Sequence, residues 1–323
     1  MDINILLGWQ EFRNGAGSCL TSFMLKMSYL GEMNVVLIFA ALIYWCVSRY
    51  YGTYFLMGWG GGRVVNGFLK VTACAYRPWI RDPRIVPDKE ALVTATGYSF
   101  PSGHSTNAGA IYGGGAIRKE FPKVLRITLG LIAVLIALSR NFLGVHTPQD
   151  ILVGLCVAVF LMWLTAKVIA WVEKHPGKDI LVMFVGIGIS VAVAVFAAVK
   201  NYPADLDAAG NLLVDGAKMA VDTYKGAGWF IGFLAGWVLE RRFVGFSTDV
   251  PMITRFTRLT TGLLSYYAIS LILIPLLRSW IPGPAGTIIT CFIQTFYITF
   301  LFPWCIKHLE RGQETKPLYA SRS

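Results

Sequence analysis

Charged residues are scarce in this sequence, and their scarcity excludes an ordinary soluble domain. Of 323 residues only 15% are charged and 55% are hydrophobic, whereas a soluble domain carries about 25% charged residues. The hydrophobic residues are gathered in long blocks, which is typical of a chain that crosses a membrane several times. The net charge of +11 does not indicate nucleic-acid binding, because the cations lie mainly in short loops between these blocks.

Cysteine pairs and histidine clusters are also missing. The six cysteines are scattered without a CxxC pair, and most lie in apolar segments, where a buried free thiol is the usual state. No zinc site is expected, since His104, His146 and Asp150 have no cysteine nearby and three cations would face the metal. The first residues lack a basic region followed by an apolar stretch and a cleavage site, so no removable signal peptide is expected.

The apolar blocks predict an all-α fold, a polytopic membrane bundle of about nine transmembrane helices with a six-helix phosphate-handling core. We divide the chain into an N-terminal interfacial segment (1–33), a core with the polar motifs (34–200), a loop plus three additional helices (201–306) and a tail (307–323). The tail from residue 307 is expected to be flexible. Residues 200–226 are expected to form a long loop with room for a short helix, and the short span 227–239 to be extended by flanking residues. The expected spans are 34–48, 53–73, 103–117, 124–139, 149–172, 180–199, 227–239, 259–277 and 284–306.

The distribution of cations predicts the orientation of the bundle. With the loop 118–126 placed in the cytoplasm, more Lys and Arg fall inside than outside, as the positive-inside rule requires. The N-terminus then lies outside and the C-terminus in the cytoplasm. Arg63, inside the second span, is expected to face the bundle or a polar cavity, because a cation facing lipid is costly.

Three short polar clusters stand between the apolar blocks, and the expected topology puts all of them on the extracytoplasmic side. They are Lys70 with Arg77-Pro78, then Pro101-Ser102-Gly103-His104, then Ser139-Arg140 with His146 and Asp150. Taken singly, each has a plain structural interpretation, such as an interfacial anchor for Lys70 or a capped helix start for Ser102. Together they provide what is needed to bind a phosphoryl group and move it to a nucleophile.

The chemistry of the second and third clusters follows from their residue types. Ser102 is a favoured N-cap and Gly103 leaves the backbone open, so the start of this helix suits a phosphate. His104 is placed to protonate a leaving-group oxygen. His146 and Asp150 are four residues apart and can meet on one helix face. A carboxylate on one ring nitrogen would leave the other nitrogen of His146 as a nucleophile.

In order and spacing the clusters resemble the signature of the type 2 phosphatidic acid phosphatase superfamily, which includes lipid phosphate phosphatases, glucose-6-phosphatase and the vanadium haloperoxidases. The chain carries Lys-x6-Arg-Pro from Lys70, Pro-Ser-Gly-His from Pro101 and Ser-Arg-x5-His-x3-Asp from Ser139. The resemblance covers about residues 50–165.

The resemblance implies a role for each residue of the three clusters. His146 would attack phosphorus and form a phosphohistidine, Asp150 would orient it, and His104 would protonate the leaving oxygen and then activate water. The phosphoryl oxygens would be held by Lys70, Arg77, Ser102, Gly103 and Arg140. No divalent metal and no cofactor is then required, because the cations would stabilise the phosphoryl oxygens in place of a metal ion.

The substrate is left open by the resemblance. Nine spans with an outside N-terminus resemble the glucose-6-phosphatase branch, which lacks an acid at the position of Asp150. That acid and the run Tyr98-Ser99-Phe100 resemble instead prenyl-pyrophosphate and sphingoid-phosphate phosphatases. The leading hypothesis is a phosphatase for a lipid phosphate or prenyl pyrophosphate, with the tail among the spans and membrane lipids as partners.

Other hypotheses from the sequence concern different classes of protein. They are a phosphatase for a soluble phosphomonoester such as glucose 6-phosphate, a phosphotransferase, an anion-binding membrane protein or transporter without turnover, and haloperoxidase-like chemistry. The last three spans are expected to serve as packing, as a substrate wall or as a partner surface. No pattern in the sequence predicts an oligomer.

Overall fold

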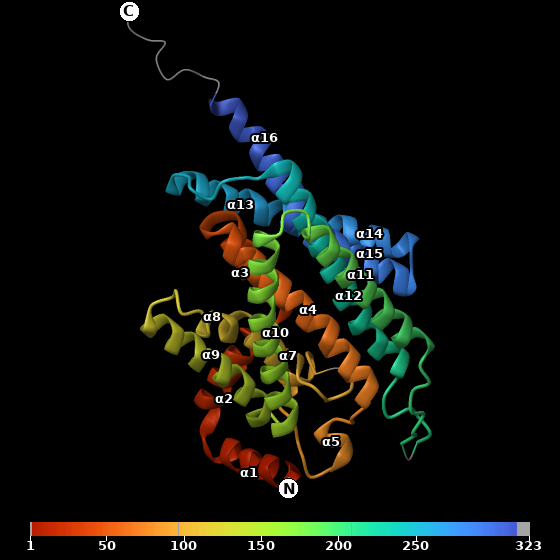
Figure 1. Ribbon diagram of the computed structural model, residues 1–323. Helices are drawn as coiled ribbons and strands as arrows, with labels where there is room; N and C mark the ends of the chain where they lie inside the picture. Colours follow the sequence, from red (N-terminus) through yellow and green to blue (C-terminus); the bar gives the residue numbers. More distant parts are fainter. Residues whose placement is uncertain (1, 96, 208, 315–323) are drawn as a thin grey trace, which may run out of the picture.

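The computed structural model describes residues 2–95, 97–207 and 209–314, and this part of the chain is almost entirely helical (Figure 1). The predicted all-α fold is thus confirmed. The helices are α1 (Asp2–Gly15), α2 (Gly17–Tyr29), α3 (Met33–Leu42), α4 (Arg49–Ala73), α5 (Pro78–Arg81), α6 (Lys89–Leu92), α7 (Gly103–Ala108), α8 (Gly114–Ala116), α9 (Lys123–Phe142), α10 (Pro148–Lys174), α11 (Asp179–Val199), α12 (Gly216–Leu239), α13 (Met252–Ala268), α14 (Ile274–Trp280), α15 (Gly283–Phe296) and α16 (Phe302–Glu314).

Each predicted span coincides with a helical segment of the described chain, and short π-helical turns continue several of the helices. By length and composition, five segments of the described residues are able to cross a membrane. Helix α2 and the segment from α3 to Val47, bent by 55°, would together add a sixth. The count of nine crossings therefore stays a prediction. The five segments are Lys123–Phe142, Pro148–Lys174, Asp179–Val199, Met252–Trp280 and Gly283–Leu309.

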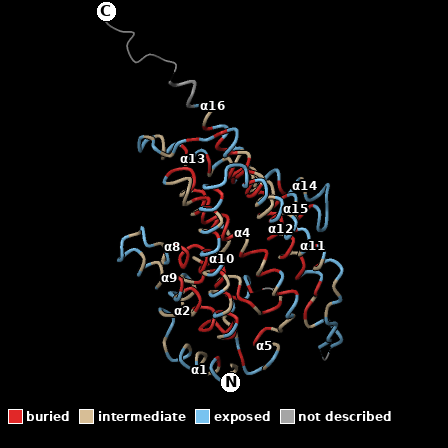
Figure 2. Tube along the Cα trace, in the orientation of Figure 1, coloured by how far each residue is buried: buried red, intermediate tan, exposed pale blue. Residues whose placement is uncertain are grey.

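Helices α4 and α12 form the centre of the bundle. Helix α4 packs against α10 and α12, while α12 also packs against α11 and α15. Figure 2 shows buried residues concentrated along both helices. Helices enclosed by other helices need less apolar surface than those facing lipid. Arg63 of α4 is only 7% exposed, so its expected position inside the bundle is confirmed.

Glycine permits the closest helix contacts in this centre. A Cβ atom added to Gly58 of α4 would lie 2.1 Å from the Sδ atom of Met162 on α10. A Cβ at Gly232 of α12 would lie 2.2 Å from the carbonyl oxygen of Phe292 on α15. Both distances are too short for a real side chain, so glycine at these positions sets how closely the helices approach.

The segment before residue 227 and the start of the tail are more helical than expected. Helix α12 begins at Gly216, within the expected 200–226 loop, and Asp215 caps it by accepting hydrogen bonds from two backbone N–H groups. The hydropathy pattern missed this start because Asp222 and Lys225 interrupt the apolar run. The tail expected to be flexible from residue 307 continues as α16 to Glu314, and its residues 315–323 lie outside the described part.

The N-terminal segment forms α1 and α2 and lies at the end of the bundle opposite α16 (Figure 1). Arg81 forms an ion pair with Asp2 at 2.7 Å, and Arg13 donates to the carbonyl of Val86 at 2.6 Å. These contacts fix α1 against the loop that follows α4. Its placement at the membrane interface stays a prediction.

Candidate active site

The junction between α9 and α10 brings His146 against Asp150. Thr147 is the N-cap of α10 and Pro148 its first residue. The Thr147 N–H donates to Oδ2 of Asp150 at 2.7 Å, and Nδ1 of His146 lies 3.3 Å from the same oxygen. The predicted contact is confirmed, but it is made across the helix cap and not along a helix face, because His146 precedes the helix.

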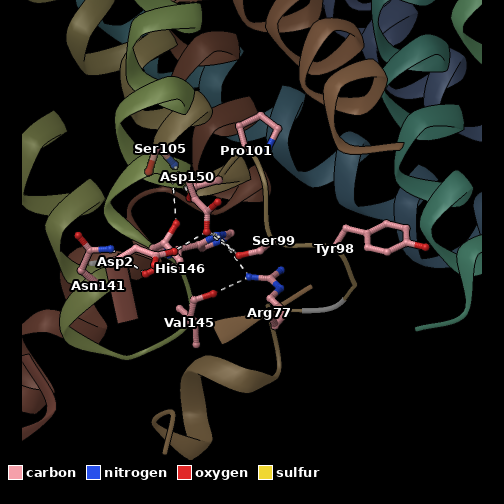
Figure 3. A network of polar contacts seen from close by, with 12 residues as sticks. Asp2, Arg77, Tyr98, Ser99, Pro101, Ser105, Asn141, Val145, His146 and Asp150 are labelled. Carbon is pink, nitrogen blue, oxygen red and sulfur yellow. Dashed lines mark hydrogen bonds and ion pairs between the residues drawn. The ribbon is translucent and has the colours of Figure 1, made fainter. Parts of the chain in front are cut away.

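The neighbours of His146 determine which ring nitrogen carries the proton. Nε2 lies 3.0 Å from Nη1 of Arg77 (Figure 3), and a guanidinium group can only donate. Nε2 is therefore the acceptor, and Nδ1 carries the proton that faces Asp150. Arg77 is held in turn by the carbonyl groups of Gly97 at 2.7 Å and Val145 at 2.8 Å. The imidazole thus presents an unprotonated nitrogen beside a fixed cation.

Ser99 completes the surroundings of the carboxylate, and the sequence analysis gave it no role. Its hydroxyl donates to Oδ2 of Asp150 at 2.5 Å and lies 3.3 Å from Nδ1 of His146 (Figure 3). Its own N–H donates to the carbonyl of Ala75 at 2.7 Å. The feature of the sequence that could have indicated Ser99 is its position shortly before the Pro101-Ser102-Gly103-His104 cluster.

The second cluster forms the start of α7. Ser102 is the N-cap, since its hydroxyl accepts from the N–H of Ser105 at 3.3 Å, and its own N–H donates to the carbonyl of Asp150 at 3.0 Å. Gly103 and His104 follow. Nε2 of His104 is buried and has no hydrogen-bond partner in the described part of the chain. The predicted capped helix start is confirmed, while a phosphoryl contact of Ser102 stays a prediction.

Two more predicted cations are buried nearby. Lys70, at the end of α4, donates to the carbonyl of Tyr98 at 3.0 Å. Arg140, at the end of α9, is 1% exposed, and its Nη1 donates to the hydroxyl of Ser28 at 2.5 Å. Nε and Nη2 of Arg140 are buried and find no hydrogen-bond partner among the described residues. Of these two cations, Lys70 lines the cavity described below, whereas Arg140 is not part of its lining.

A cavity of about 450 Å³ opens in front of His146, within the range of about 300–1,000 Å³ for small-molecule sites. Five predicted site residues line one side of it, which we call the catalytic wall: Lys70, Arg77, Gly103, His104 and His146. The other three predicted residues, Ser102, Arg140 and Asp150, are not part of its lining. This position suits an orienting role for Asp150, because its carboxylate contacts the imidazole ring of His146 and does not face the cavity.

The last helices of the chain also contribute residues to the lining of the cavity, so they form part of its wall. This C-terminal wall consists of Asp222, Lys225 and Trp229 from α12, Arg278 from α14 and Gln294 from α15.

Arg63 of α4 also lines the cavity and lies between the two walls. A Cβ atom at Gly103 would be 3.3 Å from its Nη1, and its guanidinium carbon is 6.0 Å from the centre of the Trp229 ring. The sequence analysis placed Arg63 in the bundle but gave it no part in the site.

The electrostatics of the loop residues favour a neutral His146. Burial lowers the pKa of His146 well below its usual value, the charge of Arg77 lowers it further, and the hydrogen bond to Asp150 opposes both. Burial also lowers the pKa of Arg77 to about 10, so this guanidinium stays charged near neutral pH. The site therefore combines a neutral imidazole with a cation at its reactive nitrogen.

The chain is similar to known membrane phosphatases. Residues 49–174 match the PAP2 superfamily, and residues 224–314 match the transmembrane extension of PAP2 superfamily phosphatases. Phosphatidylglycerophosphatase B of Bacillus subtilis (strain 168) is 32% identical over 157 residues, which are 45% of this chain and 73% of the relative. Human sphingosine-1-phosphate phosphatase 2 is 24% identical over 298 residues, 89% of this chain and 67% of the relative.

A shorter match links the chain to lipid A 1-phosphatase of Rhizobium johnstonii, with 38% identity over 72 residues, 22% of this chain and 28% of the relative. Among solved structures, the PAP2-type phosphatidylglycerolphosphate phosphatase of Bacillus subtilis has a TM-score of 0.43 and 29% identity, covering 55% of this chain and 86% of that one. The chain belongs to the PAP2 superfamily and is an integral-membrane phosphatase. The resemblance drawn from the three clusters is thereby confirmed.

Proposed function

We propose that the protein removes a phosphate group from a membrane lipid through a phosphohistidine formed on His146. The observation that carries this proposal is the unprotonated Nε2 of His146 at a cavity lined by cations, with Asp150 on the other ring nitrogen. The names of the relatives favour a lipid over a sugar phosphate, since they are phosphatases of phosphatidylglycerophosphate, lipid A and sphingosine 1-phosphate.

In the first step Nε2 of His146 attacks phosphorus, the nitrogen–phosphorus bond forms, and the bond to the lipid oxygen breaks. His104, whose buried Nε2 has no hydrogen-bond partner in the described chain, acts in its protonated imidazolium form, donates a proton to the departing lipid alkoxide and becomes neutral. Arg77 moves its hydrogen bond from the imidazole to a phosphoryl oxygen. Lys70 and the Gly103 N–H hold the other oxygens, where negative charge develops.

In the second step a water molecule attacks the phosphohistidine and gives a proton to His104, which restores its starting state. The nitrogen–phosphorus bond breaks and inorganic phosphate leaves. The family resemblance adds Arg140 and Ser102 as further donors to the phosphoryl oxygens, although neither residue lines the cavity in this structure. Because fixed cations take the place that a divalent ion has in many phosphoryl transfers, the reaction is expected to proceed in EDTA. A pyrophosphate would follow the same steps.

The positive-inside distribution supports placing this site on the extracytoplasmic face, with the N-terminus outside and the C-terminus in the cytoplasm. The residues that line the cavity come from segments expected on that side, namely the end of α4, the start of α7, the junction before α10 and the start of α12. A lipid headgroup in the outer leaflet would reach the site from the membrane surface.

The test is phosphate release by the purified full-length protein in detergent micelles with EDTA. The substrates are phosphatidate, phosphatidylglycerol phosphate, a sphingoid phosphate, a prenyl diphosphate and glucose 6-phosphate. His146→Ala is expected to lower kcat on lipids by about 10⁴-fold or more, while His175→Ala, an exposed histidine after α10, should retain wild-type rates. Undiminished release by His146→Ala, or loss of release in EDTA, would overturn the mechanism. Release from glucose 6-phosphate alone would overturn the lipid assignment.

A further inference from the structure

The cavity holds more cations than one reacting phosphate uses. Beyond the catalytic wall, Arg63, Lys225 and Arg278 add three positive charges, and the described lining has two carboxylates, Glu32 and Asp222. A cation withdrawn from water is costly unless an opposite charge compensates it. The phosphoryl group at His146 is already held by other residues in the proposed reaction. The additional cations therefore indicate a second anionic group on the ligand.

These three cations form a series from the interior to the cavity mouth. Arg63 is buried at 7% exposure, and its Nε has no hydrogen-bond partner in the described part of the chain. The Lys225 side chain is 31% exposed and lies 3.3 Å from a carboxylate oxygen of Asp222. Arg278 is exposed, and its Nε donates to the hydroxyl of Thr290 at 3.3 Å.

The inner end of this series reaches the reacting phosphate. Nη1 of Arg63 would lie 3.3 Å from a Cβ atom at Gly103, so the Arg63 guanidinium lies next to the start of α7, where the proposed phosphate binds. A guanidinium group with free donors binds phosphate in a planar, bidentate manner. Arg63 is thus placed between the reacting phosphate and the next anionic group of the substrate.

We propose that Arg63, Lys225 and Arg278 form a second anion subsite, which binds a further phosphate of the substrate next to the one that reacts. The preferred substrate is then a lipid with two phosphate groups, either a terminal diphosphate or a terminal phosphomonoester followed by a phosphodiester. The inference rests on the proposed function, because it takes His146 as the centre of the reaction. It assigns substrate choice to the C-terminal wall and to Arg63, outside the three motif clusters.

The decisive variant is Lys225→Gln in the full-length protein, assayed on phosphatidate with one phosphate, on phosphatidylglycerol phosphate and on a prenyl diphosphate. Loss of one charged hydrogen bond predicts a fall of about 10- to 100-fold in kcat/KM on at least one of the lipids with two phosphates. The fall on phosphatidate should be at least tenfold smaller. Lys218→Gln is the matched control, because Lys218 lies on the same helix and pairs with Asp215 three residues away, but is 79% exposed.

Two inhibitors and a comparison of two lipids distinguish a terminal diphosphate from a phosphodiester as the origin of the second phosphate. If the subsite takes a terminal diphosphate, methylenediphosphonate should inhibit phosphatidate hydrolysis more strongly than methylphosphonate, and Lys225→Gln should abolish the difference. If it takes a phosphodiester, the selective loss should appear with phosphatidylglycerol phosphate and not with the prenyl diphosphate.

Arg63→Gln should show the same selectivity with a larger loss. Its buried place in α4 makes folding uncertain, so Lys225→Gln carries the test. Equal losses of Lys225→Gln on all three lipids, or no loss on any, would overturn the second subsite while leaving the proposed function standing. Absence of His146-dependent release from every lipid in the wild type would instead overturn the proposed function, and the subsite with it.

Discussion

The catalytic wall and the C-terminal wall face one cavity but are built differently. In the catalytic wall His146 and Arg77 are fixed by several short hydrogen bonds, and Asp150 behind them accepts from three groups. In the C-terminal wall Lys225 makes one ion pair, and the exposed Arg278 makes one bond of 3.3 Å. Fixed donors suit a transition state whose geometry does not vary. Partly exposed cations suit a headgroup that has to enter and leave.

The two walls also owe their positions to different forces. In the catalytic wall, His146 and His104 are placed by local structure, namely the capping box of Thr147 and Asp150 and the N-cap at Ser102, while Arg77 is held by the more distant carbonyl groups of Gly97 and Val145. The C-terminal wall is placed by the packing of α12 against α4 and α15. Chemistry and substrate choice should therefore be separable by mutation, and the following predictions test that separation from the largest expected effect to the smallest.

The largest effect is expected for Asp150→Asn. The neutral amide no longer fixes the proton on Nδ1 of His146 or stabilises positive charge on the ring, so kcat should fall by about 10³-fold. KM should stay close to the wild-type value, because Asp150 does not line the cavity. Steady-state phosphate release from phosphatidate measures both constants.

The control for this variant is Asp215→Asn, which alters another capping carboxylate at the start of α12. Its kcat should stay within about threefold of wild type. Comparable losses in both variants would show that helix capping, and not orientation of His146, accounts for the effect.

An intermediate effect is expected for Gly232→Ala, which acts on the packing behind the C-terminal wall. The new Cβ atom would lie 2.2 Å from the carbonyl oxygen of Phe292, so α12 and α15 have to move apart, at a cost of about 1–3 kcal/mol. Thermal unfolding in detergent should show a lower Tm. Release from phosphatidate per folded molecule should change little.

Gly188→Ala on α11 is the matched control, because nothing lies within 4 Å of the added Cβ atom, and its Tm should not fall. A fall in Tm as large as that of Gly232→Ala would mean that glycine-to-alanine changes destabilise this bundle regardless of helix contacts.

The difference between the catalytic wall and the C-terminal wall also explains which features could be predicted from the sequence. The residues of the catalytic wall were predicted from the order and spacing of the three motif clusters. A short spacing, such as the four residues from His146 to Asp150, limits which side chains can meet. Ser99 was missed, since no spacing rule shows that a residue 51 positions before Asp150 will meet its carboxylate. The helical segments were predicted from hydropathy, but the number that cross a membrane depends on the surroundings of each helix.

The C-terminal wall could not be predicted from spacing. Its residues come from three helices, and they reach the cavity only because α12 packs against both α4 and α15. The polar residues Asp222 and Lys225 even led the sequence analysis to place a loop where α12 begins. Such residues look like solvated charges in a sequence, and only the tertiary structure shows that they line a cavity.

The smallest effect is a shift in the pH profile, which tests whether the catalytic wall tunes His146. Burial and the charge of Arg77 lower the pKa of His146, so its neutral, nucleophilic form should persist below pH 6.5, the usual pKa of histidine. Removing the charge with Arg77→Gln makes the imidazolium less unfavourable and raises that pKa. The acidic limb of kcat/KM should therefore move to higher pH, by about one unit or less.

Arg77→Gln also removes a proposed phosphoryl donor, so the rate should fall at every pH, and only the position of the limb is informative. Arg81→Gln is the matched control, because Arg81 lies four residues further on and pairs with Asp2 outside the cavity. Its profile should match the wild type. If the acidic limb of the kcat/KM profile does not move in Arg77→Gln, burial alone lowers the pKa of His146, and Arg77 contributes only by binding phosphate.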